Sequence, residues 1–203
     1  MRTSVLASVL LVGVLTVGGP VACAQGQAKA DSGFRVTSAD LALTFTTEES
    51  NVLPGSNNNF WMRGGSFDAG VTFFHGLGAA VNFTGLHAGN ISPNINLDEI
   101  ALMAGPRYTF HLGGKYPNRL FVESLFGGVH ARDGIFPTAT GVTPAAGSFS
   151  LQVGGGWDVT VWKDLAVRVF EADWVRTSLP NGASNVQDHL RLAFGVSYHI
   201  GKH

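Results

Sequence analysis

The sequence predicts an all-β fold: a single closed barrel of eight antiparallel strands that run up and down in chain order. The first reason is that apolar and polar residues alternate one by one along eight stretches of the chain, which is the period of a β-strand. The second reason is that long and short connections alternate between these stretches. The third is that charged residues make up only 13% of the chain, about half the share usual in soluble domains.

The clearest signal is a pair of strands over residues 149–176, joined by a very short turn at residues 162–164. One face of the first strand is bulky and apolar, and the other is small and polar with a single acid. Small polar side chains fit a narrow barrel interior, so the bulky face would contact lipid. The pair therefore predicts a transmembrane barrel hairpin. The bulky face consists of Phe149, Leu151, Val153, Gly155, Trp157, Val159 and Val161, and the polar face of Ser150, Gln152, Gly154, Gly156, Asp158 and Thr160.

The first three predicted strands show the same alternation in shorter form. They lie near residues 40–46, from about 62 to 73, and around 81–84. In each of them the residues that oppose the apolar face are mostly Asp, Asn, Thr and Gly, which again fit an interior. The apolar face carries Leu41, Leu43, Phe45, Phe67, Ala69, Val71, Phe73, Val81 and Phe83.

The fourth, fifth and eighth strands are predicted over residues 99–110, 120–131 and 189–200. Pro106 interrupts the fourth strand. Because a closed barrel has no free edge and proline has no N–H to donate, we expect a local bulge or a missing ladder bond at this residue.

The seventh strand does not keep one phase. If Arg168 points inward, strict alternation leaves Glu171 and Asp173 facing lipid. A carboxylate inside the bilayer is costly, so the strand should either shift its phase or end at the interface. We predict a β-bulge near Phe170 and Glu171, since one extra residue moves both acids to the interior.

The connections between strands predict which end of the barrel faces outward. Four longer segments are rich in Asn, Gly, Ser and Pro, and three short ones lie between them. With the long loops outside and the tight turns in the periplasm, both chain ends lie on the periplasmic side. The long loops are expected at residues 48–60, 88–97, 132–147 and 178–188, and the short turns at 75–78, 112–118 and 162–164.

The first 24 residues predict a cleaved signal peptide, and hence export. Arg2 precedes an apolar run that is too short to span a bilayer and ends in glycine and proline. Ala22 and Ala24 supply the small residues that a signal peptidase recognises, with cleavage before Gln25. Residues 25–36 then form a flexible lead-in, and residues 37–203 form the barrel. An anchoring helix and a lipoprotein acylated at Cys23 are the alternatives.

Composition excludes several classes of function. The net charge is −1 and no basic face is present, which argues against nucleic acid as a partner. The single cysteine lies in the predicted signal peptide, so the exported chain has no disulfide and no thiol chemistry. The 7 histidines show no known metal-ligand spacing. No metal and no cofactor is predicted.

Several short motifs resemble those of a known family. They are Gly154-Gly155-Gly156-Trp157-Asp158, Ala166-Val167-Arg168, Ala172-Asp173-Trp174, Gly105-Pro106-Arg107-Tyr108 and Gly195-Val196-Ser197-Tyr198. From about Thr37 onward the chain resembles the eight-stranded bacterial outer-membrane β-barrels of the OmpA-like and OmpX-like type, without the peptidoglycan-binding domain appended to OmpA. It departs from them at its end, where Gly201-Lys202-His203 follows Ile200 in place of a terminal aromatic residue. The resemblance implies location in a Gram-negative outer membrane, contact with its lipids, and barrel-insertion machinery and periplasmic chaperones as partners in biogenesis.

Charged residues on the predicted inward faces would share a lumen that is only wide enough for side chains. Buried charge must be compensated, so we expect carboxylates and guanidiniums to pair and plug the lumen, with bidentate contacts from arginine. A gated narrow pore and a catalytic carboxylate are the alternatives. The residues of this predicted network are Asp40, Asp68, Glu99, Arg107, Glu123, Asp158, Arg168 and Arg191.

The sequence thus predicts an integral outer-membrane barrel with a structural or surface-interaction role. A small passive pore and a soluble lipocalin-like carrier, with the apolar faces turned inward, are the alternatives. A lipid-modifying enzyme would need an exposed Ser-His-acid group. Only Ser197 and His199 share a strand face at short spacing, and they would point inward at the periplasmic end. No catalytic residue is predicted, and the loops carry no recognisable ligand motif.

Overall fold

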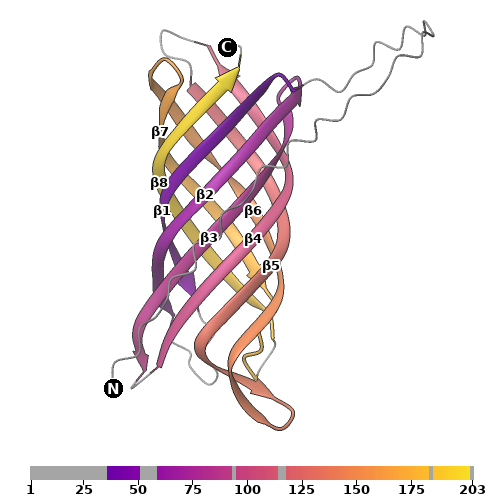
Figure 1. Cartoon of the computed structure of the whole chain (residues 1–203), viewed down its shortest axis with the longest axis vertical. Helices are drawn as coiled ribbons and strands as arrows, with labels where there is room; N and C mark the ends of the chain where they lie inside the picture. Colours follow the sequence, from indigo (N-terminus) through magenta and orange to yellow (C-terminus); the bar gives the residue numbers. More distant parts are fainter. Residues whose placement is uncertain (1–35, 51–58, 93–94, 114–117, 183–184, 202–203) are drawn as a thin grey trace, which may run out of the picture. The chain divides into compact units, whose positions relative to one another are not determined.

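The computed structural model describes residues 36–50, 59–92, 95–113, 118–182 and 185–201. The predicted signal peptide lies outside these residues, as does the lead-in up to residue 35. No helix of the described segments is long and apolar enough to cross a membrane. The strands, which Figure 1 shows running up and down in chain order, are β1 (Ser38–Ser50), β2 (Phe60–Phe74), β3 (Leu77–Ser92), β4 (Ile95–Leu112), β5 (Asn118–Thr138), β6 (Gly141–Trp162), β7 (Leu165–Thr177) and β8 (Gln187–Gly201).

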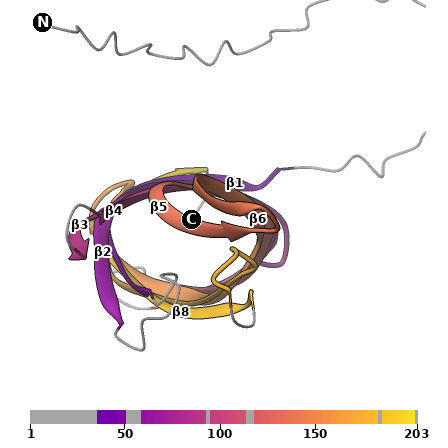
Figure 2. The ribbon, with the colours of Figure 1, turned by 90° about the horizontal axis from the view of Figure 1, so that it is seen from below.

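The eight strands form one closed sheet in the order β1 to β8. Each strand is antiparallel to the next, and β1 also pairs with β8, so that Leu41 lies opposite Ala69 on one side and Tyr198 on the other. The ring is visible end-on in Figure 2. Because the first and last strands pair with each other, the barrel has no free edge. The predicted all-β, eight-stranded, up-and-down barrel is confirmed.

Strict alternation sorts the side chains between an inner and an outer face. On β1, Leu41, Leu43 and Phe45 are exposed, whereas Ala42 and Thr44 are buried. The same pattern repeats around the ring, and large apolar side chains from every strand are exposed on the outer wall. Among the described outward-facing residues, charged side chains lie toward the strand ends and are missing from the middle of the wall. The outer wall therefore carries a continuous apolar belt.

One end of the barrel, here called the turn end, has tight connections. His75 and Gly76 link β2 to β3 with φ values of 44° and 91°. Positive φ at both central residues is the mark of a type I′ turn, whose twist matches that of the paired strands. Lys163, with φ of 45°, begins the equally short connection from β6 to β7. The short turns predicted at residues 75–78 and 162–164 are thus confirmed.

The opposite end, the loop end, differs from the sequence prediction. Strands β3 to β6 continue through most of residues 88–97 and 132–147, which were predicted to be long loops, and β1 continues to Ser50. The Asn, Gly and Pro content of these segments suggested loops. Nevertheless their inward side chains, such as Leu97 and Phe136, are buried and hold the backbone in extended hairpins. Of the other two predicted long loops, residue 59 and residues 178–182 and 185–186 lie between strands, and residues 51–58 and 183–184 are outside the described residues.

The two predicted irregularities are both present. In β7 the register shifts relative to β6 and β8 between Arg168 and Glu171. Val169 and Phe170 both face outward at this bulge, and Glu171 and Asp173 are consequently buried inside. The ladder between β4 and β5 is interrupted beside Pro106 without a change of register.

Candidate functional site

The inward side chains of the turn-side half form an ion network centred on two arginines. Arg107, on β4, donates from Nε to Glu123 Oε2 at 2.7 Å, from Nη1 to Asp40 Oδ2 at 2.9 Å and from Nη2 to Asp68 Oδ2 at 2.6 Å. Its side chain is only 4% exposed. The three acids come from β5, β1 and β2, so one guanidinium connects four strands. Because each contact is charge-assisted and directional, this arginine fixes the relative position of the strands.

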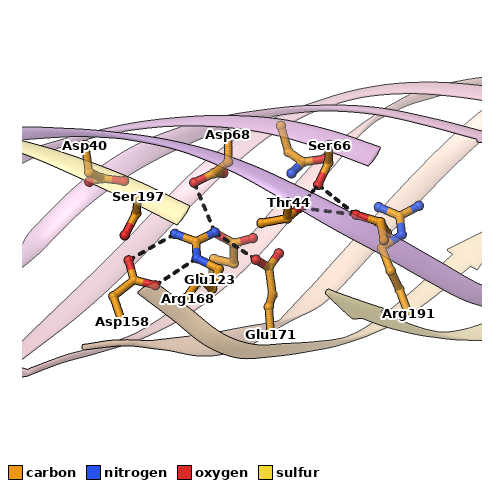
Figure 3. Close-up of polar contacts among 12 residues, drawn as sticks. Asp40, Thr44, Ser66, Asp68, Glu123, Asp158, Arg168, Glu171, Arg191 and Ser197 are labelled. Atoms are coloured by element: carbon orange, nitrogen blue, oxygen red, sulfur yellow. Dashed lines mark hydrogen bonds and ion pairs between the residues drawn. The ribbon is translucent and has the colours of Figure 1, made fainter. Parts of the chain in front are cut away.

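The second arginine, Arg168 on β7, is equally enclosed. It donates to both carboxylate oxygens of Asp158, at 2.9 and 3.3 Å, and from Nη1 to Glu171 Oε2 at 2.7 Å. Its Nη1 also lies 3.5 Å from Asp68 Oδ1, which joins the two halves of the network. Figure 3 shows Arg168 reaching Asp158, Asp68 and Glu171. The bulge in β7 brings Glu171 into this position. The turn-side network is defined as Asp40, Asp68, Arg107, Glu123, Asp158, Arg168 and Glu171.

Local sequence makes room for these large side chains. The Phe121 ring centroid lies 4.6 Å from Arg107 Cζ and 4.4 Å from Arg168 Cζ, so the ring contacts both cations. Gly156 is required beside it, since a Cβ there would come within 2.7 Å of the ring. The glycine run on the inner face of β6 therefore serves to admit an aromatic ring and charged groups.

A third buried arginine forms a separate group one layer closer to the loop end. Arg191 donates from Nε to Glu48 Oε2 at 2.7 Å and from Nη1 to Gln152 Oε1 at 2.9 Å. His189 Nδ1 lies 2.6 Å from Glu48 Oε1. Gln152 in turn donates to Glu123 Oε1 at 3.2 Å, which links this group to the turn-side network. The side-chain amide of Gln152 thus connects the group around Arg191 to the turn-side network.

Acids outnumber arginines in the lumen. Glu99 and Asp173 are buried, and neither carboxylate accepts a hydrogen bond from the described residues. Asp173 lies against Gly154, where a Cβ would stand 2.0 Å from its Oδ1. Glu123, Glu171 and Asp173 each place one oxygen within 4.8 Å of the other two, a spacing that could hold a cation. Because Glu123 and Glu171 already accept from arginines, this cluster is best described as part of the ion network.

An apolar cluster, mostly on β2 to β5, occupies part of the loop-side half of the lumen, beside the buried polar side chains Glu48, His189 and Arg191 of β1 and β8. Within this cluster Leu97, Leu125 and Leu179 have no exposed area. Figure 2 shows the β5–β6 hairpin, which carries Phe136, lying across part of the barrel mouth. The loop-side cluster is defined as Met62, Ala80, Leu86, Ala88, Leu97, Ala101, Met103, Leu125, Val129, Ala131, Phe136 and Leu179.

All eight residues of the predicted lumen network lie on inward faces. Six of them belong to the turn-side network, whereas Arg191 and Glu99 lie closer to the loop end. Sequence reasoning missed Glu48, because it was assigned to a loop, and it missed the apolar cluster. A usable signal existed: the inward residues Leu86, Ala88 and Leu97 are apolar, and the outward residues His87 and Asp98 are polar, the reverse of the mid-wall pattern.

The geometry contains no hydrolytic triad among the described residues at the turn end. Ser197 Oγ lies 3.3 Å from His199 Nε2, and Asp158 Oδ2 lies 3.7 Å from the same nitrogen. A triad needs the nucleophile and the acid on different ring nitrogens. The neighbouring hollow, lined by Asp40, Arg107 and other inward residues, has a volume of about 10 Å³, space for roughly one water. The arrangement can hold charge in place, and this hollow has no room for a substrate.

Comparisons with known proteins show the fold. No protein-family model matches the sequence, and no match to a curated protein is found. Ail, the attachment invasion locus protein of Yersinia pestis, was solved with the heparin analogue sucrose octasulfate. It matches with a TM-score of 0.54 at 14% identity, covering 82% of this chain and 100% of that chain. Neisserial surface protein A (NspA) matches with a TM-score of 0.54 at 16% identity, covering 79% of this chain and 95% of that chain. The chain therefore has the fold of the eight-stranded outer-membrane β-barrels that its sequence motifs resemble.

Proposed function

We propose that this chain is an integral outer-membrane protein whose closed barrel holds the loop end at the cell surface in a structural or interaction role. The observation that carries the proposal is the distribution of polarity. Large apolar side chains are exposed around the whole wall, while the charged side chains of the strand middles point inward. A soluble carrier would need the opposite arrangement, because exposed apolar surface of this extent is unstable in water. A lipid bilayer is the solvent that suits this wall.

The proposal includes a closed lumen. The turn-side network and the loop-side cluster follow each other along the barrel, and both consist of buried side chains apart from the half-buried Asp40. The arginines of the network are held by several charge-assisted hydrogen bonds each, which opposes their movement. The role of the eight predicted lumen residues is then to compensate one another's charge and to fix the strands. The small volume of the hollow beside Asp40 and Arg107 supports a structural role for these residues.

The proposal also covers export and biogenesis. Residues 1–24 direct secretion and are removed before Gln25, and periplasmic chaperones and the barrel-insertion machinery then place the chain in the outer membrane. The mass of the chain purified from outer membranes tests the cleavage site. A mass equal to residues 25–203 supports it, and retention of residues 1–24 contradicts it.

The first experiment is the migration of unboiled and boiled protein from the membrane fraction on SDS gels. A closed, detergent-resistant barrel migrates faster unboiled, and this is the expected result. A single band from a protein that is soluble without detergent would contradict the proposal and favour the lipocalin-like carrier. Conductance in planar bilayers then separates the two membrane functions: we expect no steady channel, and a stable unitary conductance would favour the passive pore.

A further inference from the structure

A row of charged side chains crosses the outer wall toward the loop end. The strand register places Arg63 opposite His87, His87 opposite Asp98, and Asp98 opposite Arg132, so the row runs over β2 to β5 at one level. His87 Nδ1 lies 2.6 Å from Asp98 Oδ1, so the acid is engaged by the histidine. Among the described residues, the side chains of Arg63 and Arg132 form no hydrogen bond or ion pair. The two ends of the row are thus the exposed guanidiniums of Arg63 and Arg132, which are available to contact an anionic group.

The same residues line a hollow in the wall. Its volume is about 310 Å³, and its lining includes Arg63, His87, Arg132, Gly85 and the two acids Asp98 and Glu99. Gly85 lies opposite Gly65 on the outward face, and a Cβ at Gly85 would meet no atom within 4 Å. Gly85 therefore adds no side chain to the hollow at a position directly beside the charged row.

The apolar belt begins immediately on the turn side of the hollow. Two residues further along each strand, Phe67 lies opposite Phe83, and Phe83 lies opposite Leu102. Their exposures are 43%, 48% and 57%. The wall thus presents, in order, cations, a hollow and an exposed apolar surface. A ligand that matches this order has an anionic head and acyl chains.

We propose that the hollow binds the phosphorylated headgroup of a lipid of the outer leaflet, with its acyl chains over Phe67, Phe83 and Leu102. Three strand spacings separate the backbones of Arg63 and Arg132, about 14 Å, which suits a headgroup with two separated phosphates such as that of lipid A. Arginine forms the stronger, bidentate contact with phosphate, and cations at the end of an apolar belt lie at headgroup depth. This inference rests on the proposed function, because it needs a membrane barrel whose loop end faces the outer leaflet.

The test measures binding of bisphosphorylated lipid A to the purified, folded barrel in phosphatidylcholine nanodiscs. The variant is R63Q/R132Q, which keeps the hollow and removes both cations. Its matched control is R176Q, which removes one exposed arginine from β7 on another part of the wall. We expect the double variant to lose roughly tenfold or more in affinity and the control to bind like the unaltered barrel. We also expect the unaltered barrel to bind monophosphorylated lipid A more weakly than the bisphosphorylated form.

Three results would overturn the inference: equal binding by the double variant, an equal loss in R176Q, or no preference for the second phosphate. Migration on SDS gels before and after boiling is recorded for every variant. If the unaltered chain fails to migrate as a folded barrel, the proposed function fails. If it folds and shows no dependence on Arg63 and Arg132, only the headgroup site fails.

Discussion

On the turn side of the lumen, Arg107 and Arg168 are surrounded by carboxylates, whereas toward the loop end inward side chains of β2 to β5 form the apolar loop-side cluster. These two regions, called the ionic half and the apolar half, occupy the lumen and are stabilised by different interactions. The ionic half depends on direction and on charge balance, since a buried charge without its partner is costly. The apolar half depends on volume and removal of surface from water, as in the core of a soluble protein.

The order of the two halves along the barrel follows the polarity of the outer wall. Where the outer wall is apolar, Arg107 connects four strands inside the lumen by directional bonds, and these bonds fix the strand register. Toward the loop end the extended hairpins of β3 to β6 leave the apolar belt. There the outward residues, such as His87 and Asp98, are polar, and apolar side chains move inside. On β3 to β5, apolar side chains thus lie on the outer wall beside the turn-side network and lie inside the barrel where the outer wall becomes polar.

The largest effect is expected from breaking the ionic half at its centre. Arg168→Met removes the guanidinium that bonds Asp158 and Glu171, so Glu171 loses its ion pair and Asp158 loses its bidentate partner in the lumen. Truncating one partner of a buried ion pair costs about 3–5 kcal/mol. Equilibrium unfolding in urea, in the same lipid vesicles as the unaltered barrel, measures the free energy of unfolding. A loss below about 1 kcal/mol would contradict the structural role of the network.

A somewhat smaller effect is expected in the apolar half. Leu125→Ala creates a cavity in the loop-side cluster, where the side chain has no exposed area. Such truncations cost about 2–5 kcal/mol, and the loss depends on how far the neighbours collapse. The same unfolding assay measures it, and Leu125→Met, which keeps the volume, is the control with an expected loss under about 1.5 kcal/mol. Equal losses in both variants would show that volume does not govern this half.

A still smaller loss of stability is expected from adding a methyl group at Gly154, which lies against Asp173 in the lumen. Gly154→Ala would place a Cβ 2.0 Å from Asp173 Oδ1 and 2.4 Å from the Ala172 carbonyl oxygen, so the strand has to shift. Overpacking of this kind costs about 1–3 kcal/mol. Gly85→Ala is the matched control, because a Cβ there meets no atom within 4 Å. If the two substitutions destabilise the barrel equally, the cost comes from the glycine backbone and not from the contact with Asp173.

Particular residues show how much the sequence could predict. Alternation with period two sufficed for the ring, for the inward side of Asp68, Arg107 and Asp158, and even for the bulge before Glu171, because a lipid-facing acid is physically excluded. The sequence did not predict that Glu48 and Leu97 lie on strands, because the Asn, Gly and Pro residues nearby are typical of loops. Contacts with buried side chains inside the barrel hold those strands extended. Which acid meets which arginine depends on shear between strands, and local alternation carries no information about it.

The smallest effect on stability is expected from a substitution at Arg176, which lies on the outer wall and belongs to neither half of the lumen. Arg176 donates to Asp188 at 2.8 and 3.0 Å in the same bidentate geometry that Arg168 uses with Asp158, but on the exposed outer wall. Water and salt screen an exposed pair, so Arg176→Gln should leave the urea midpoint unchanged within error. Measuring it beside Arg168→Met compares two similar hydrogen-bond geometries in different surroundings. A loss in Arg176→Gln approaching that of Arg168→Met would mean that bond geometry, and not burial of charge in the lumen, determines how strongly an arginine stabilises this barrel.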